Sequence, residues 1–486
     1  MTLTPDQFAA FFEELHGVTP FPWQRRLAAQ VSEGTWPEFI DLPTASGKTA
    51  CIDVAIFALA VQAALRPEER TVSRRIFFVV NRRVIVDEAY ERASRIRKEL
   101  INAEPGTVLH DVAQTLRRIS GDEDAPPLDV SLLRGGVVRD NRWARSITQP
   151  TVITSTIDQV GSRLLFRGYG LRDEAAPLHA ALIAHDSTIL LDEAHISRPF
   201  VETLQAIRKY RGDEWAEQPI RTPFHFVQMT ATHDAASGNV LQLDEEDRAD
   251  EVLRKRHDSS KPIRLEVAKK AKGKKTLSEL AAAVVEEAVN LQSDARQNIA
   301  IVVNRVATAR EAYDLLRERF AANDDQEPAA DVELAIGRMR PYDRDQLTQR
   351  IQERVGNRTS NSSDDVNDDD SETRPFFVVA TQCLEVGADF DFDGMVSECA
   401  SLDALRQRFG RLNRSGNHKQ PAGAIIIRAD QVRTEAQLAA LEKKGDVDDP
   451  IYGNALARTW NWLQEVAADG HVDFGVNAMG RQIAHH

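Results

Sequence analysis

The sequence lacks the features of an exported or membrane-bound protein. Its three cysteines, Cys51, Cys383 and Cys399, lie in apolar contexts without C-x-x-C spacing, which argues against a disulfide framework or a zinc site. No apolar run reaches the ~18 residues of a membrane helix. The N-terminal segment MTLTPDQFAAFFEELHG is acidic, whereas a secretory signal is basic. We therefore expect buried thiols, no membrane segment and a cytoplasmic location.

Positive charge is also scarce, because 75 acidic residues outnumber 61 lysines and arginines and give a net charge of −14. This argues against a broadly cationic nucleic-acid surface. The acid is unevenly distributed, and residues 355–375, VGNRTSNSSDDVNDDDSETRP, alone carry six acids against two arginines. Almost no apolar residue is present there, so 355–374 is predicted to be a disordered surface insertion. A local basic groove elsewhere remains compatible with this balance.

Short apolar runs alternate with helical stretches along most of the 486 residues. This pattern is typical of parallel sheets covered on both faces, and the length predicts more than one domain. The expected strands are 38–44, 76–80, 151–156, 187–193 and 224–230 in a first block, and 298–304, 332–337, 375–381, 394–399 and 423–428 in a second. We predict an α/β fold with a first lobe over 1–260, a linker over 261–295, a second lobe over 296–430 and a helical C-terminal appendage over 431–486. The basic run KKAKGKK in the linker is either solvated or a nucleic-acid contact.

The segment IDLPTASGKTA, residues 40–50, reads as strand, loop and helix. Backbone N–H groups in such a loop and at a helix N-terminus bind phosphate. Lys48 would reach the β- and γ-phosphates, and the Thr49 hydroxyl would bind Mg²⁺. Leu42 and Ala45 stand where such loops often have glycine, so a plain strand-to-helix turn with a solvated lysine is the alternative.

Two acidic residues follow a later strand in ILLDEAH, residues 189–195. Asp192 would hold Mg²⁺, and Glu193 would deprotonate the attacking water. In QMTATHD, the hydroxyls of Thr230 and Thr232 could couple these carboxylates to the γ-phosphate. The alternative is a strand end with solvated acids.

A basic helix is expected over residues 401–416, SLDALRQRFGRLNRSG. Arg411 and Arg414 are three residues apart, hence on one helical face, and could stabilise charge on a γ-phosphate. Gln407 would couple this helix to the nucleotide. A solvated basic helix is the alternative.

These motifs, together with FPWQRRLA (21–28) and ATQCLEVGADFD (380–391), occur in the order found in superfamily 2 helicases, which the chain resembles. TSTIDQVGSRLLFRGYG, LAIGRMRPYDRDQL and YGNALARTWNWL narrow the resemblance to the CRISPR-associated helicase-nuclease of type I interference. The resemblance spans most of residues 20–465. It implies two RecA-like lobes with ATP and Mg²⁺ between them, and the nucleotide-binding residues Gln24, Thr44, Ala45, Ser46, Gly47, Lys48, Thr49, Gly387 and Asp389.

The resemblance further implies a monomeric motor on single-stranded DNA that a guide-RNA effector complex has opened. The family usually carries an HD nuclease domain. The four His-Asp dipeptides here fall within or beside helicase elements, so the nuclease is expected in trans or on a portion absent from this chain. An RNA or DNA-repair helicase, and an ATP-gated clamp that does not unwind, are the alternatives.

Nucleic-acid contacts are expected from loops that follow the strands. Hydroxyls, backbone amides and a few arginines can grip phosphates without reading bases. The alternative for each residue is simple loop capping. The candidates are Asn81, Arg82, Arg134, Gly135, Thr156, Asn304, Arg305 and Thr381.

Overall fold

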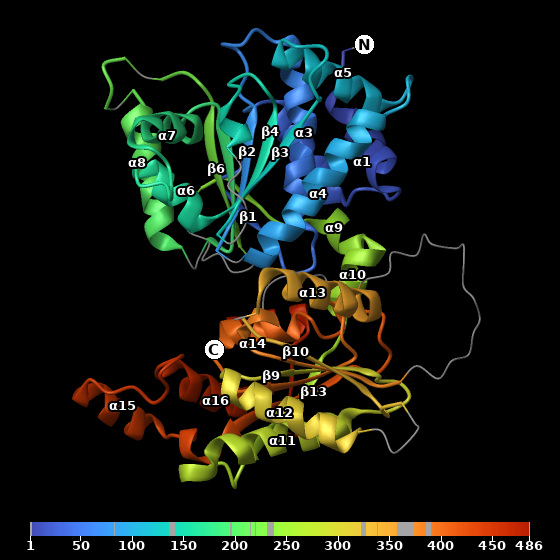
Figure 1. The fold of residues 1–486 in the computed structure, drawn as a ribbon, viewed down its shortest axis with the longest axis vertical. Helices are drawn as coiled ribbons and strands as arrows, with labels where there is room; N and C mark the ends of the chain where they lie inside the picture. Colours follow the sequence, from blue (N-terminus) through green and yellow to red (C-terminus); the bar gives the residue numbers. More distant parts are fainter. Residues whose placement is uncertain are drawn as a thin grey trace. The chain divides into compact units, whose positions relative to one another are not determined.

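The computed structural model describes residues 2–81, 83–135, 141–194, 197–213, 215–218, 220–230, 238–321, 327–337, 339–356, 374–384 and 390–485. The chain divides into two compact units, residues 1–253 and 254–486. Each unit is a parallel sheet with helices on both faces (Figure 1). This confirms the predicted α/β fold class.

The first unit is built on a seven-stranded sheet with the order β3-β4-β2-β5-β6-β1-β7. All of its strand pairs are parallel. The central strands are apolar and buried, as expected when helices cover both faces. The strands are β1 (Phe39–Asp41), β2 (Arg75–Val80), β3 (Asp129–Leu133), β4 (Thr151–Thr156), β5 (Ser187–Asp192), β6 (Phe224–Thr230) and β7 (Val240–Leu241).

Helices of the first unit lie on both faces of this sheet (Figure 1). One face packs on α1 (Phe8–His16), α2 (Pro22–Ser32), α3 (Cys51–Val61), α4 (Arg83–Asn102) and α5 (Val108–Ser120). The other packs on α6 (Ile157–Leu164), α7 (Ala176–Ala184) and α8 (Arg198–Arg211). The short helices α9 (Glu245–Ala249) and α10 (Glu251–Asp258) follow β7.

The second unit has a seven-stranded sheet with the order β10-β11-β9-β12-β13-β8-β14. Only the edge pair β14–β8 is antiparallel among the described strands of this sheet. The strands are β8 (Pro262–Ala268), β9 (Asn298–Val302), β10 (Asp331–Ala335), β11 (Phe376–Ala380), β12 (Gly394–Glu398), β13 (Ala422–Arg428) and β14 (His471–Asp473). One face packs on α11 (Thr276–Leu291) and α12 (Val306–Arg319). The other packs on α13 (Pro341–Val355), α14 (Leu402–Phe409), α16 (Ala455–Val466) and α17 (Val476–His485), and α15 (Glu435–Lys444) precedes α16.

The structure differs from the expectation for residues 261–295. This segment is not a linker, because β8 joins the second sheet beside β13 and α11 packs on that sheet. Arg264 and Glu266 alternate with apolar residues in β8, which is a strand pattern, but the expected strands are continuous apolar runs and β8 is not one. Part of the C-terminal appendage also joins the sheet as β14. Residues 357–373 of the acidic insertion lie outside the described residues.

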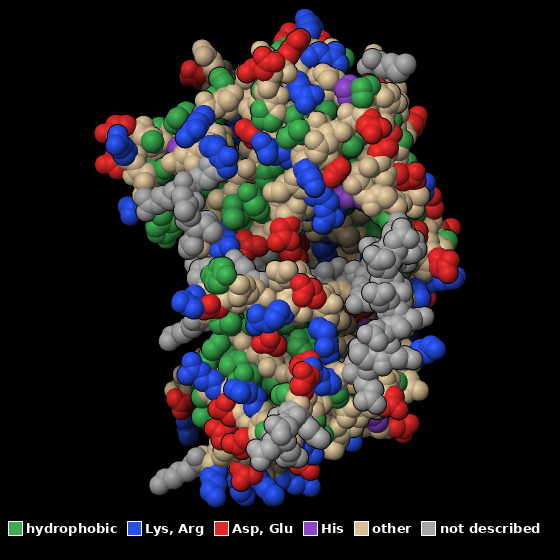
Figure 2. All heavy atoms as spheres, turned by 45° about the vertical axis from the view of Figure 1, so that its right-hand side comes forward, with side chains coloured by type: hydrophobic (Ala, Val, Ile, Leu, Met, Phe, Trp, Pro, Cys, Tyr) green, Lys and Arg blue, Asp and Glu red, His purple; other side chains and the backbone are tan. Residues whose placement is uncertain are grey.

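Acidic and basic side chains are mixed on the surface. In Figure 2, Lys and Arg side chains lie among Asp and Glu side chains across the visible face. The net charge of −14 therefore does not make this face uniformly acidic. In the part of the chain that is described, no helix has the length and apolarity to cross a membrane.

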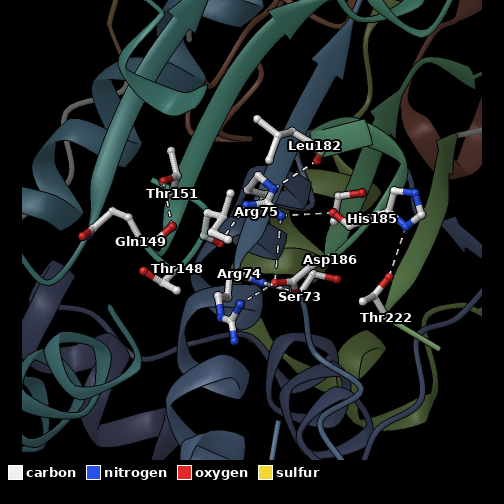
Figure 3. A network of polar contacts seen from close by, with 12 residues as sticks. Ser73, Arg74, Arg75, Thr148, Gln149, Thr151, Leu182, His185, Asp186 and Thr222 are labelled. Atoms are coloured by element: carbon white, nitrogen blue, oxygen red, sulfur yellow. Dashed lines mark hydrogen bonds and ion pairs between the residues drawn. The ribbon is translucent and has the colours of Figure 1, made fainter. Parts of the chain in front are cut away.

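A buried arginine joins the start of β2 to the end of α7 (Figure 3). Arg75 is 4% exposed, and its guanidinium donates hydrogen bonds to the carbonyls of Leu182 (3.0 Å), Ile147 (3.0 Å) and His185 (3.2 Å). Carbonyls at a helix C-terminus lack partners within the helix and carry partial negative charge. The Asp186 carboxylate accepts from the backbone N–H of Arg74 at 3.0 Å. One guanidinium thus satisfies several carbonyls at the edge of the sheet where the strands begin.

We expect Arg75→Met to lower the local free energy of unfolding by about 3 kcal/mol, because buried carbonyls lose their donors. Hydrogen–deuterium exchange of peptides that cover β2 and β5 measures this. The matched control is Arg221→Met, which removes an exposed ion pair with Asp213 at 3.2 Å and should cost at most about 1 kcal/mol. Equal exchange rates in the two variants would contradict the assignment.

Candidate functional site

The loop between β1 and α3 has the backbone shape of a phosphate-binding loop. Ala45 and Gly47 have positive φ angles of 63° and 78°, and the turn Lys48–Ala50 leads directly into α3. Alternation of left- and right-handed residues turns successive N–H groups toward one side, which makes an anion-binding concavity. The predicted strand–loop–helix arrangement of residues 40–50 is present.

Residues at the start of α2 form hydrogen bonds with the carbonyls of this loop. The indole N–H of Trp23, a fully buried residue, donates to the carbonyl of Ser46 at 3.0 Å. The Gln24 amide donates to the carbonyl of Gly47 at 3.4 Å and accepts from the backbone N–H of Phe21 at 3.0 Å. The structure thus brings Gln24 to the loop, beside the position where the resemblance requires it.

Trp23 is a positioning residue that the sequence pattern did not single out. Its backbone N–H donates to Asp247 at 2.7 Å, and Asp247 also pairs with Arg26 at 2.7 Å. Because Asp247 is fully buried, it fixes the start of α2 to α9. The available signal was the aromatic residue directly before Gln24 in FPWQRR.

Lys48 points along the loop toward its own strand. Its ammonium donates to the carbonyls of Leu42 at 2.8 Å and Pro43 at 3.3 Å. Burial lowers the pKa of Lys48 below its ordinary value, and the charges of Asp192, Glu193 and Asp41 oppose this shift. Three carboxylates therefore lie close enough to act on this ammonium.

Asp192 and Glu193 stand at the end of β5, as the ILLDEAH pattern predicts. The backbone N–H of Glu193 donates to the Asp192 carboxylate at 3.0 Å. Glu193 has a φ of 54°, a conformation that costs energy for a non-glycine residue and clusters at functional sites. His195 lies outside the described residues.

β6 lies between β5 and β1 and connects the two groups. The carbonyl of Thr230, a buried residue at the end of β6, accepts from the backbone N–H of Leu42 at 3.1 Å. Thr230 is therefore adjacent to the first residues of the phosphate loop. Thr232 lies outside the described residues.

These residues fit magnesium-bound ATP. The loop offers backbone N–H groups, Lys48 a cation, and Thr49 and Asp192 the hydroxyl and carboxylate oxygens that Mg²⁺ prefers. A Cβ on Gly47 would lie 3.2 Å from the Gln24 amide nitrogen and 3.4 Å from the Phe21 ring. Because Gly47 has no side chain, Gln24 and Phe21 can lie this close to the loop backbone. The exposed Thr44 and the buried Ser46 complete the loop.

In the second unit, the expected helix over 401–416 is shorter than predicted. α14 ends at Phe409, and Arg411 and Arg414 lie in the loop that follows it. The reason is a backbone pairing of Leu412 with Phe392, which a continuing helix would prevent. Arg411 and Arg414 therefore do not share a helical face, although both stay in one short loop. Gln407 lies in the last turn of α14.

Arg408, which belongs to the basic run of residues 401–416, has a structural role in the second unit. It is fully buried and donates to Ser397 Oγ (2.9 Å), the Glu398 carbonyl (2.9 Å), Asn304 Oδ1 (2.8 Å) and the Tyr452 hydroxyl (2.9 Å). This guanidinium joins α14 to the ends of β9 and β12 and to the C-terminal helices. The guanidinium of Arg408 is thus directed to groups of the second unit itself, and we do not assign it a contact with a nucleotide.

The proposed nucleic-acid residues differ in exposure. Asn81 is exposed, and it follows Val80, which pairs with Thr156 in the sheet. Arg305 is 37% exposed and lies 3.8 Å from Asp449.

Other members of that set are engaged inside their units. Arg134 is buried and ion-paired with Asp87 at 2.5 Å. The Asn304 amide donates to the Cys399 carbonyl at 2.8 Å and accepts from Arg408. Thr381 is buried, and Gly135 is partly exposed. Arg82, Gly387 and Asp389 lie outside the described residues.

Comparison with known proteins supports the reading of these motifs. The family described as "CRISPR-associated nuclease/helicase Cas3, C-terminal" matches residues 295–417. A curated Cas3 from Methanothermobacter thermautotrophicus is 32% identical over 145 residues, which are 29% of this chain and 14% of that protein. The chain resembles the helicase portion of Cas3.

Solved structures share the fold. T. fusca Cas3 with ATP aligns over 98% of this chain and 56% of its own, with a TM-score of 0.54 and 17% identity. Mss116p bound to single-stranded RNA and AMP-PNP aligns over 91% of this chain and 78% of its own, with a TM-score of 0.53 and 14% identity. These similarities show that the chain has the fold of two tandem RecA-like lobes. The chain spans little more than half of the T. fusca protein and a small part of the curated relative.

We expect Gly47→Ala to weaken ATP binding about tenfold or more, because its Cβ crowds Gln24 and the backbone is strained at this φ. Isothermal titration with a non-hydrolysable ATP analogue measures the affinity.

The matched control is Gly121→Ala at the end of α5. Gly121 has the same φ of 78°, and nothing lies within 4 Å of its added Cβ. This variant should lose stability and keep its ATP affinity. If both variants bound ATP as the wild type does, the loop would not be the nucleotide site.

Proposed function

We propose that the protein is an ATP-dependent DNA helicase or translocase of type I CRISPR interference. In this proposal it acts on single-stranded DNA that a guide-RNA effector complex has exposed. The observation that carries the proposal is the convergence of Lys48, Asp192 and Glu193 beside a loop with left-handed residues. Similarity to Cas3 supports the choice of this helicase class.

The proposed chemistry divides among residues of this loop and of β5. Thr49 and Asp192 would hold Mg²⁺, which supplies charge neutralisation on the phosphates when bound. Lys48 binds the β- and γ-phosphates, and its two carbonyl partners are exchanged for phosphate oxygens. Glu193 orients the attacking water and accepts its proton. We also propose that Arg411 and Arg414 stabilise charge on the γ-phosphate in the transition state.

We propose that polar groups at the ends of strands grip the DNA. Asn81 is exposed and follows β2, whereas Thr156 is the last residue of the neighbouring β4 and is buried, so that its hydroxyl is the less accessible of the two groups. Arg305 follows β9 in the second unit. Their amide, hydroxyl and guanidinium groups can bind phosphates without selecting bases, which suits a motor that moves over any sequence.

The partners in this proposal are the effector complex and an HD nuclease. The relative named "CRISPR-associated nuclease/helicase Cas3" is much longer than the segment that this chain matches. The nuclease acts in trans or from a portion that this sequence does not contain. We propose that the motor itself acts as a monomer.

We expect single-stranded DNA to stimulate ATP hydrolysis, and Glu193→Gln to lower kcat by about 100-fold or more because the water loses its base. Glu193→Gln should retain ATP binding, whereas Lys48→Ala should lose both binding and hydrolysis. Steady-state phosphate release with no nucleic acid, with single-stranded DNA and with single-stranded RNA measures this.

Glu202→Gln is the matched control, because Glu202 is exposed on α8, where it forms an ion pair with the exposed Arg198 at 3.3 Å. It should hydrolyse ATP at the wild-type rate. Equal or better stimulation by RNA would instead indicate an RNA helicase. Retained ATP binding without hydrolysis under every condition would indicate an ATP-gated clamp.

A further inference from the structure

The loop that carries Arg411 and Arg414 runs beside the segment that leads into β12. The backbone N–H of Phe392 donates to the Arg411 carbonyl at 2.9 Å, and that of Asn413 donates to the Phe392 carbonyl at 2.9 Å. These two bonds fix the first half of the loop. They leave the backbone at Arg414 and Ser415 to be held by other groups.

A single carboxylate holds that second half. Asp391 accepts from the backbone N–H of Arg414 at 2.6 Å and from that of Ser415 at 3.2 Å. The Asp391 side chain is 8% exposed, so water competes little for these bonds. Charge-assisted bonds to backbone N–H groups are stronger and shorter than neutral ones. The direction in which the Arg414 side chain leaves the backbone therefore depends on Asp391.

His418 lies between this carboxylate and a second one. Its Nε2 is 3.3 Å from Asp391, and its Nδ1 is 3.2 Å from Asp393. The backbone N–H of His418 donates to the Asn413 side chain at 3.0 Å. Asp393 in turn accepts from the backbone N–H groups of Gln297 and Asn298, both at 2.9 Å. The imidazole thus connects the loop to the start of β9.

We propose that Asp391 and His418 are positioning residues for ATP hydrolysis, which hold the backbone of Arg414 so that its guanidinium is preorganised for the γ-phosphate. The inference rests on the proposed role of Arg414. Preorganised groups act on the transition state more than on the bound substrate. Loss of the clamp should therefore lower kcat and leave KM for ATP nearly unchanged.

The charges around the clamp give it a pH dependence. Burial alone would raise the pKa of Asp391, but hydrogen bonds from His418 and Ser415 and the charge of His418 hold it below its ordinary value. Burial would lower the pKa of His418, but Asp391 and Asp393 raise it above its ordinary value. The doubly anionic surroundings favour the imidazolium.

The raised pKa of His418 and the lowered pKa of Asp391 determine how the stability of the clamp changes with pH. The imidazolium stabilises the clamp fully below the ordinary histidine pKa of about 6.5, and this contribution is lost as the pH rises through the raised pKa. The charge of Asp391 contributes above its ordinary pKa and is lost only in acid. Among the described residues, Lys261 and Arg414 also carry charge near the clamp, since the charges of Asp391 and Arg414 both act on the pKa of Lys261.

Lys261 sets the upper limit of a useful pH range. Its ammonium donates to the Phe409 carbonyl at 3.0 Å, beside Asp473. Burial lowers the pKa of Lys261 to about 8, and the charges of Asp391 and Asp473 oppose the shift while Arg414 adds to it. Below about pH 7.5 this lysine stays mainly protonated, so changes there report on His418.

The test compares DNA-stimulated hydrolysis by the full chain from about pH 6 to pH 7.5 in wild type, His418→Gln and Asp391→Asn. We expect kcat of the wild type to fall as the pH rises across this range, because the His418 imidazolium loses its proton. His418→Gln should not show this fall, because glutamine does not titrate. Asp391→Asn should lower kcat about tenfold with KM for ATP within about twofold. His471→Gln is the matched control, because His471 is exposed on β14 and bonds the Asp469 carbonyl at 3.0 Å.

NMR titration of the imidazole resonance missing from His418→Gln reports the pKa without hydrolysis. A pKa of His418 above its ordinary value of about 6.5 in the wild type would support the clamp even if Asp391→Asn did not fold, and a lowered pKa in a folded Asp391→Asn variant would assign the shift to Asp391. Normal kcat and an unchanged pH profile in both variants would overturn the inference. Arg414→Ala tests the role of Arg414 separately from the clamp. Hydrolysis at the wild-type rate in that variant would refute the proposed role of Arg414.

Discussion

Parallel pairing of β1, β6 and β5 is the constraint on which the candidate nucleotide site depends. Parallel strands end at the same edge of a sheet, so the loop after β1 and the carboxylates after β5 must meet there. The register places Asp41 opposite Thr230 and Asp192 opposite Met229. Lys48 therefore meets Asp192 and Glu193 although the two segments are far apart in sequence. A shift of either strand would separate the cation from the carboxylates.

The site demands that one edge of a buried sheet carry polar and strained groups. Ala45 and Glu193 adopt left-handed conformations there, and Lys48 is a cation whose pKa is lowered by burial. Such features cost stability. Packing on the faces of the sheet, and hydrogen bonds at the end where the strands begin, offset this loss of stability. Apolar strands pack between helices, and buried arginines such as Arg75 satisfy the carbonyls at the ends of helices.

Sequence reasoning predicted the parts of this arrangement that depend on local patterns. Apolar runs identified β4 and β6 with their observed bounds, and GKT and DEAH identified the two halves of the site. It missed β8, because the expected strands are continuous apolar runs, whereas β8 alternates apolar and charged residues, the pattern of a half-buried strand. It extended α14 past Phe409, because Leu412 continues the helical pattern while its backbone pairs with Phe392. The periodicity of residues within one segment does not predict such backbone pairings with a distant segment.

The two groups of candidate catalytic residues are held in different ways. Lys48 begins the turn that leads into α3, and its ammonium donates to the carbonyls of Leu42 and Pro43 directly after β1, so its position is set as soon as the first sheet forms. Arg414 has no helix around it, and its backbone depends on a carboxylate and an imidazole. A loop held by a few charged groups can be released at a smaller free-energy cost than a helix in a core. The arginine loop is therefore the element better suited to change during a cycle of hydrolysis.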